Sequence, residues 1–211
     1  MGTKKIVIVD YEMGNLHSVD NACKLLGYET TISSDRDTIR SASALILPGV
    51  GAFGHAMANL DALGLIDPIK DHIQRGNPFL GVCLGFQLLF EESSEFGVHK
   101  GLAILKGTVD RFPASSQGQP LKVPHMGWNR LQIVQDNRFS QGLNPNEFMY
   151  FVHSYYTNPT NPSIIFSKTT YEGFEYCSSV SQENILAVQF HPEKSSIKGL
   201  KLLNNWLTSI E

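Results

Sequence analysis

The sequence contains few cysteines, no large excess of positive or negative charge, and no long hydrophobic run. Its three cysteines, Cys23, Cys83 and Cys177, form neither an even set nor a C-x-x-C pair, which excludes a disulfide framework and favours a reducing compartment. The 17 Lys and Arg residues against 20 Asp and Glu residues give no basic surface for nucleic acid or an anionic membrane. The first apolar run, residues 6–9, is too short for a signal peptide or a membrane span. We therefore expect a cytoplasmic protein.

The sequence contains enough apolar residues to form the hydrophobic core of one large domain. Hydrophobic residues make up 42% of the 211 residues, and single α/β domains often exceed two hundred residues. No low-complexity stretch, charge block or repeat marks a boundary. We expect residues 1–211 to form a single domain.

The first half of the chain alternates strand and helix signals. We expect strands at residues 5–10, 44–47 and 79–82, and helices around 19–26 (closed by Gly27), from Pro68 onward and over 86–92. From about residue 104 to 192 strand follows strand, as at 148–155 and 185–190, and a helix over 200–210 closes the chain. This pattern predicts a three-layer α/β/α domain with a mostly parallel central sheet and an antiparallel extension.

The most informative segment is Gly81-Val82-Cys83-Leu84-Gly85, which joins an apolar strand to a predicted helix. A nucleophile in this Gly-x-Cys-x-Gly pattern stands on a sharp, strained turn, where flanking glycines avoid clashes. The helix N-terminus favours a thiolate, and the backbone N–H of Leu84 faces the place of a developing oxyanion. The alternative is a buried structural cysteine between two packing glycines.

Only one of the seven histidines is followed by its own orienting carboxylate. His191-Pro192-Glu193 comes directly after a predicted strand, and residues two apart in extended chain project to the same side. Glu193 is thus predicted to orient one ring nitrogen of His191 while the other faces Cys83. Taken as isolated residues, His191 and Glu193 would more often form a plain surface turn.

Two other activities are disfavoured by the sequence. Residues 49–54 match G-x-G-x-x-G, but the dinucleotide-binding fingerprint belongs on the first strand-to-helix turn, which here spans residues 10–15. The cysteines and histidines lack paired metal-ligand spacing, so no metal and no cofactor is expected. A catalytically idle docking subunit is the third alternative, and the complete triad argues against it.

Together, Gly81–Gln87 and His191–Glu193 resemble the class I, or triad, glutamine amidotransferase family. Five further segments, residues 10–15, 48–53, 125–129, 151–156 and 190–195, narrow the resemblance to glutaminase subunits that supply ammonia to a cyclase in histidine biosynthesis. Subunits of anthranilate or pyridoxal phosphate synthesis are the runner-up, and residues 125–129 disfavour them. Glu12 is a departure, because the family usually carries glycine there.

The resemblance implies a role for further residues. The oxyanion would be bound by the backbone N–H groups of Val50 and Leu84. The implied contacts to glutamine are Gly51, Gln87, Glu95, His153, Ser154 and Tyr155. The implied partner is a (β/α)8-barrel cyclase subunit in a heterodimer, and its expected contacts are Asn15, Trp128, Tyr150 and Lys194.

Overall fold

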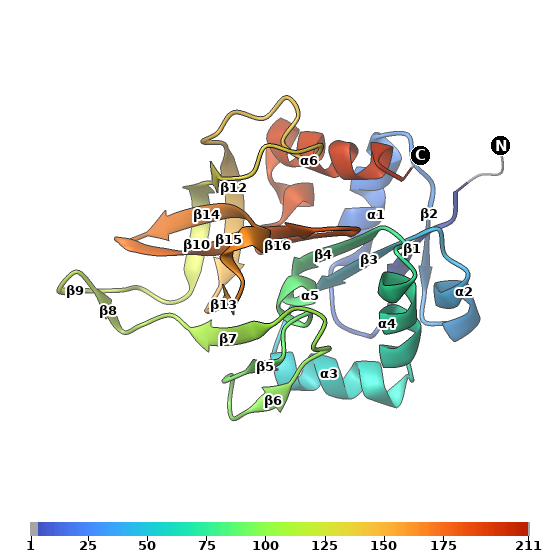
Figure 1. Ribbon diagram of the computed structural model, residues 1–211, viewed down its shortest axis with the longest axis horizontal. Coiled ribbons are helices and arrows are strands. Elements are labelled where there is room, and N and C mark those ends of the chain that lie inside the picture. The colour runs from blue at the N-terminus through green and yellow to red at the C-terminus, as the bar shows by residue number, and fades with distance from the viewer. Residues whose placement is uncertain (1–3, 211) are drawn as a thin grey trace.

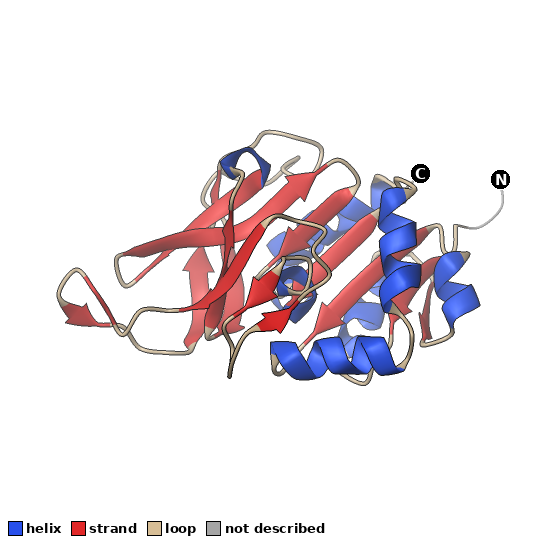
Figure 2. Cartoon of the chain, turned by 60° about the horizontal axis from the view of Figure 1, so that its bottom comes forward, coloured by secondary structure: helices blue, strands red, loops and turns tan. Residues whose placement is uncertain are grey.

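The fold is a twisted sheet covered by helices, as seen in a computed structural model that describes residues 4–210 (Figure 1). The helices are α1 (Leu16–Leu25), α2 (Arg36–Arg40), α3 (Phe53–Ala62), α4 (Ile66–Gln74), α5 (Leu84–Gln87) and α6 (Ser196–Thr208), with 3-10 turns at Pro162–Ile164 and Pro192–Lys194. Figure 2 shows the helices gathered around one end of the sheet, while the other end consists of strands.

The strands follow the predicted order of a parallel half and an antiparallel half. They are β1 (Ile6–Val9), β2 (Thr30–Ser33), β3 (Ala44–Gly49), β4 (Phe79–Cys83), β5 (Glu92–Ser93), β6 (His99–Lys100), β7 (Gly107–Arg111), β8 (Ser115–Ser116), β9 (Gln119–Pro120), β10 (His125–Arg130), β11 (Gln132–Ile133), β12 (Phe148–His153), β13 (Tyr155–Pro159), β14 (Ile165–Tyr171), β15 (Phe174–Gln182) and β16 (Ile185–Val188). The main sheet runs β2-β1-β3-β4-β16-β15-β13-β7-β5-β6, and β10 with β12 forms a separate ribbon.

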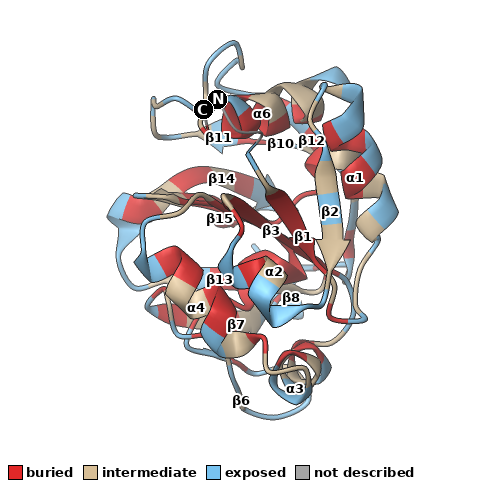
Figure 3. Ribbon diagram, turned by 90° about the vertical axis from the view of Figure 1, so that its right-hand side faces the viewer, coloured by how far each residue is buried: buried red, intermediate tan, exposed pale blue. Residues whose placement is uncertain are grey.

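Two hydrophobic cores lie on opposite faces of this sheet. Side chains alternate along β1 and β3: Val7 and Leu45 belong to one core, whereas Ile8 and Ile46 belong to the other. Helices α2 to α5 cover the first face, and α1 and α6 cover the second, where Trp206 is fully buried (Figures 1 and 3). This explains why β1 and β3 are apolar at every position, as buried parallel strands require. The predicted three-layer fold is confirmed.

Three element boundaries differ from the prediction. Helix α4 begins at Ile66, so Pro68 lies in its first turn, where its missing N–H costs no intrahelical bond. Helix α5 is only four residues long and does not continue over residues 88–92, because the chain turns there into β5. The predicted strand 148–155 is interrupted at Ser154, which separates β12 from β13.

The parallel register brings three strand ends together. Gly49 of β3 is paired with Cys83 of β4, and Val82 of β4 is paired with Val188 of β16. In open parallel sheets the space beyond the carboxyl ends of the strands is where ligands bind. The residues that follow β3, β4 and β16 therefore share one edge of the sheet.

Candidate active site

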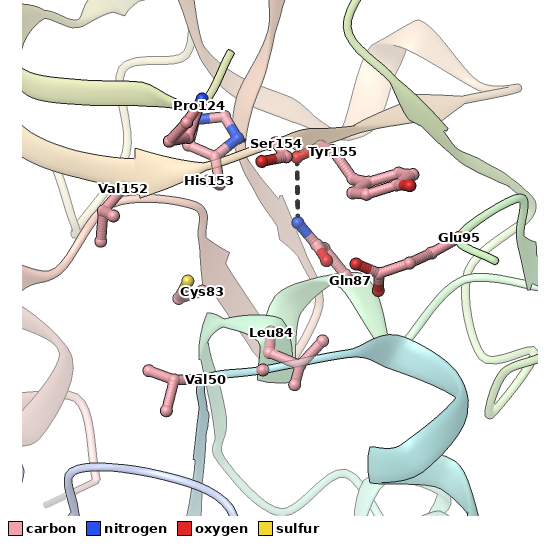
Figure 4. Close-up of a pocket in the computed structure, with 11 residues that line it drawn as sticks. Val50, Cys83, Leu84, Gln87, Glu95, Pro124, Val152, His153, Ser154 and Tyr155 are labelled. Atoms are coloured by element: carbon pink, nitrogen blue, oxygen red, sulfur yellow. Dashed lines mark hydrogen bonds between the residues drawn. The ribbon is translucent and has the colours of Figure 1, made fainter.

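Cys83 stands on the predicted strand-to-helix turn. Its backbone has φ 56° and ψ −109°, a region that side-chain-bearing residues rarely adopt, and α5 starts at the next residue. Gly85 makes the tight turn possible, because a Cβ there would overlap the carbonyl oxygen of Leu47 on β3. The bend is thus fixed by close packing of α5 against β3, and it directs the sulfur toward the cavity (Figure 4).

His191 and Glu193 form a buried pair just beyond β16. The Nδ1–H of His191 donates to Oε1 of Glu193 over 2.9 Å, and only 4% and 3% of the two side chains are exposed. The backbone is held on both sides: the His191 N–H donates to the carbonyl of Tyr150 over 3.0 Å, and Ser195 Oγ donates to the His191 carbonyl over 2.6 Å. Pro192 then opens a 3-10 turn that carries Glu193 back toward the ring.

The imidazole of His191 faces Cys83 with its second nitrogen. Burial lowers the pKa of His191, but interactions with Cys83 and Glu193 outweigh it and raise the pKa to about 10. Nε2 is buried and has no hydrogen-bond partner among residues 4–210, so it is available to a reacting group. An imidazolium beside a thiolate is the charge arrangement that nucleophilic cysteine chemistry requires.

A cavity of about 370 Å³ opens above the sulfur. It is lined by Val50, Gly51, Cys83, Leu84, Gln87, Glu95, Pro124, Val152, His153, Ser154 and Tyr155 (Figure 4). Every residue that the resemblance implies for the oxyanion site or for glutamine binding lies in this lining. The size suits a small ligand enclosed by the protein.

A hydrogen bond from Tyr11 anchors the start of the loop that follows β3. The Tyr11 hydroxyl donates to the Pro48 carbonyl over 2.9 Å and occupies the space that a Cβ at Gly49 would need. Val50, at the top of this loop, exposes 43% of its surface to the cavity and solvent, and Gly51 has φ 106°. The loop therefore combines an anchored start with a glycine whose backbone conformation other residues avoid.

Glu95 has a structural contact as well as a place in the cavity. Its Oε2 accepts a hydrogen bond from the backbone N–H of Phe53 over 2.6 Å, at the N-terminus of α3. A carboxylate is favoured there by the positive end of the helix dipole. The anchored carboxylate presents negative charge to the cavity, as binding of an ammonium group requires.

His153 is held by the protein through both ring nitrogens. Nδ1–H donates to the Tyr155 carbonyl over 2.8 Å, and Nε2 lies 3.2 Å from the Tyr176 hydroxyl. His125 Nδ1 lies 3.0 Å from the same hydroxyl, and its Nε2 accepts from Asn129. The Tyr155 carbonyl only accepts, so His153 carries its proton on Nδ1 and its Nε2 accepts from the Tyr176 hydroxyl. The Asn129 NH2 only donates, so His125 carries its proton on Nδ1 and donates it to the same hydroxyl. Burial lowers the pKa of His125 to about 4 and that of His153 to about 3.

Pro124 in the cavity lining and Gln189 beside the sulfur were missed by sequence reasoning. Gln189 is fully buried, and its Nε2 lies 3.7 Å from the Cys83 sulfur. The signal was present, since Gln189 precedes His191 by two positions, the same spacing that linked His191 to Glu193. The sequence alone assigns Gln189 to the end of the strand over residues 185–190 and gives its side chain no separate role.

The residues expected at a partner interface are not part of the cavity lining. Trp128 and Tyr150 face each other across the β10–β12 ribbon with ring centroids 6.1 Å apart, and Trp128 is 53% exposed. Asn15 caps α1 by accepting from the Ser18 N–H over 3.3 Å, and Lys194 is exposed. Glu12, where the family usually has glycine, has φ 67°, the left-handed region that glycine enters most easily.

A parallel sheet that brings a strained cysteine elbow and a buried His–Glu pair to one edge is the arrangement expected of a glutamine amidotransferase. The chain belongs to the class-I glutamine amidotransferase family, whose model matches residues 7–210. It is similar to the imidazole glycerol phosphate synthase subunit HisH of Syntrophotalea carbinolica, with 48% identity over 203 residues, 95% of this chain and 98% of that protein. The same subunit of Aquifex aeolicus is 48% identical over 208 residues, 98% of each chain.

Solved structures show the same fold at lower identity. A crystal structure of a glutamine amidotransferase superposes with a TM-score of 0.73 at 20% identity, covering 99% of each chain. The structure of PurLQS from Thermotoga maritima gives a TM-score of 0.75 at 16% identity, with 100% of each chain covered. Within residues 4–210, no helix combines the length and apolarity needed to cross a membrane.

Proposed function

We propose that this chain is the glutaminase subunit of an imidazole glycerol phosphate synthase. It hydrolyses glutamine to glutamate and ammonia, and passes the ammonia to a cyclase subunit in histidine biosynthesis. The observation that carries the proposal is the Cys83 elbow at the floor of the cavity, facing the free Nε2 of a His191 whose Nδ1 is bound to Glu193. Residues 1–211 act as one amidotransferase domain.

The first half-reaction forms a thioester. The Cys83 thiolate attacks the side-chain amide carbon of glutamine, and the carbonyl oxygen becomes an oxyanion. The backbone N–H groups of Leu84 and Val50 stabilise that charge, and loss of one such donor typically costs about 10²–10³ in rate. The C–N bond then breaks as His191 Nε2–H gives its proton to the leaving nitrogen, which departs as ammonia.

The second half-reaction restores the enzyme. Neutral His191 takes a proton from water, and the resulting hydroxide adds to the thioester carbon. The C–S bond breaks and regenerates the thiolate beside the imidazolium, the new carboxylic acid loses its proton to solvent, and glutamate leaves. Glu193 keeps the ring oriented through both steps and stabilises its charged form.

The cavity lining holds the substrate in line with the sulfur. Glu95 provides negative charge for the α-ammonium group, and Gln87 beside it, with Ser154 and Tyr155, provides polar contacts. Gly51 allows the chain to pass close to the substrate, and His153 supports the wall from behind through the Tyr155 carbonyl.

Ammonia becomes ammonium in water at neutral pH and loses its nucleophilicity, so an open release would be wasteful. The partner is a (β/α)8-barrel cyclase that receives ammonia through a channel in a heterodimer, in the cytoplasm. It combines ammonia with a phosphoribulosyl-formimino carboxamide ribotide to give imidazole glycerol phosphate and aminoimidazole carboxamide ribotide. Trp128, which is exposed, and the half-buried Tyr150 beside it anchor the partner together with Asn15 and Lys194, because aromatic clusters at the surface are typical interface anchors.

The proposal is tested with the reconstituted heterodimer. Glutamate release and glutamine-dependent formation of imidazole glycerol phosphate should both disappear in Cys83→Ala, whereas synthesis from added ammonium salt should persist. Glutaminase activity that survives Cys83→Ala would contradict the mechanism. If the chain bound a chorismate-using subunit and not the cyclase, the assignment to histidine biosynthesis would be wrong.

A further inference from the structure

Gln189 donates a side-chain hydrogen bond to the Cys83 sulfur. It follows β16, its backbone N–H donates to the Ser178 carbonyl over 2.9 Å, and its side chain is fully buried. The carboxamide has two contacts: Oε1 accepts from Gln87 Nε2 over 2.9 Å, and Nε2 donates to Cys83 Sγ over 3.7 Å. Rigid neighbours therefore hold this amide against the nucleophile.

The orientation of the two amides follows from their partners. Gln87 Nε2 lies 3.0 Å from the Tyr155 carbonyl, which only accepts, so the NH2 end of Gln87 must point there. Its second hydrogen is then directed to Gln189, which must present its oxygen to Gln87 and its NH2 to the sulfur. A flipped Gln189 would place two NH2 groups together and turn an oxygen toward the thiolate. The network excludes that arrangement.

We propose that Gln189 is a catalytic residue that donates an N–H hydrogen bond to the Cys83 thiolate and fixes the sulfur between its own amide and the His191 imidazolium. The assignment rests on the proposed function and deepens it. Hydrogen bonds to a charged acceptor are stronger than those to a neutral one, and buried sites strengthen them further. The donor favours the thiolate over the thiol and sets the direction of its attack.

The same contacts give Gln87 a defined role. With both hydrogens of Gln87 committed to Tyr155 and Gln189, only its Oε1 remains for the cavity. Gln87 therefore meets the substrate as an acceptor and binds an N–H group. Gln189 thus acts on the nucleophile directly and on substrate binding through Gln87.

Matched glutamine-to-methionine variants separate these two effects. Methionine is similar in length, apolar, and unable to donate to sulfur. In Gln189→Met, the pH midpoint of Cys83 alkylation by iodoacetamide should rise by about 1–2 units and kcat should fall about 10- to 100-fold, as loss of a hydrogen bond to a charged group implies. In Gln87→Met, the KM for glutamine should rise, and the alkylation midpoint should shift by less than in Gln189→Met, because the Gln189 amide remains beside the sulfur and loses only one of the groups that orient it.

The other two thiols do not interfere with this measurement. Burial raises the pKa of Cys23 and of Cys177 to about 12, so neither reacts appreciably below pH 9. Mass spectrometry of the Cys83 peptide in the assembled heterodimer gives the midpoint. If Gln189→Met does not fold, Gln189→Asn replaces it, because an amide one methylene shorter cannot reach the sulfur and should shift the midpoint in the same direction.

An unchanged alkylation midpoint in Gln189→Met, or equal shifts in both methionine variants, would overturn the assignment of Gln189. Neither outcome would affect the proposed function, which fails instead if Cys83→Ala retains glutaminase activity. The two ideas are therefore tested by different measurements.

Discussion

Replacing Tyr176 with phenylalanine removes one oxygen from the centre of a buried hydrogen-bond chain. The hydroxyl lies 3.0 Å from His125 Nδ1 and 3.2 Å from His153 Nε2, and Tyr176 is 3% exposed. Burial raises the pKa of this phenol well above its ordinary value, so it remains a donor over the whole working range of pH. In Tyr176→Phe the His125 ring keeps a donor without an acceptor, and the His153 ring keeps an acceptor without a donor.

The expected loss of stability follows from those two groups. Each of the two buried polar atoms left unsatisfied costs about 1–3 kcal/mol, so the variant should lose about 2–6 kcal/mol of unfolding free energy. For a chain of this length each kcal/mol lowers Tm by about 2–4 °C, so Tm should fall by between about 4 and 24 °C. The His153 bond to the Tyr155 carbonyl is also loosened, so the KM for glutamine should rise several-fold, with kcat nearly unchanged because Cys83 is untouched.

Tyr171→Phe is the matched control. Tyr171 stacks on the same His125 ring with centroids 4.0 Å apart, but its hydroxyl donates to the Lys122 carbonyl at the surface. Its loss should cost no more than about 0.5 kcal/mol. Urea unfolding gives the free energies, and steady-state glutaminase assays of the heterodimer give KM and kcat. Equal losses in both variants, or an unchanged KM in Tyr176→Phe, would refute the reasoning.

Three further predictions concern the triad, the elbow and pH. Glu193→Gln removes the carboxylate that helps to raise the pKa of His191, so kcat should fall about 100-fold or more while substrate binding changes little, as single-turnover assays can show. Gly85→Ala places a methyl group on the Leu47 carbonyl and should destabilise the fold by more than about 3 kcal/mol; soluble yield and urea unfolding near the native value would contradict this. Acidification from pH 6.5 toward 4 should destabilise the protein, because the unfolded chain protonates His153 near pH 6.5 whereas the folded chain does so only near 3. A free energy of unfolding that stays flat over this window would contradict the neutral assignment.

A second histidine also makes the protein less stable as pH falls below 6.5. The pKa of His125 is lowered to about 4, so its protonation favours the unfolded chain, as does that of His153. The raised pKa of His191 acts at higher pH: its stabilisation is complete below about 6.5 and is lost only as pH rises toward 10. Stability should therefore fall on both sides of a maximum near neutral pH.

Local sequence determined the strands of the parallel half and the position of the nucleophile. Residues 44–47 and 79–82 are apolar at almost every position, and such runs are stable only between two helical layers. The Gly-x-Cys-x-Gly pattern predicted the bend at Cys83, because glycines on both sides permit a sharp turn, and packing of α5 against β3 fixes it. The helix expected over residues 86–92 was wrong, since helical propensity alone does not show where packing turns the chain into β5.

The sequence by itself determined the class of fold, the bend at Cys83 and the contact between His191 and Glu193, because each depends on patterns of residues close together in the chain. Only the tertiary structure decided which groups meet at the sulfur. Gln87 and Gln189 are 102 positions apart, and the chain from His125 through Tyr176 to His153 joins three strands. Such contacts depend on strand register and on how buried donors and acceptors are matched, and no local pattern in a single sequence specifies either one.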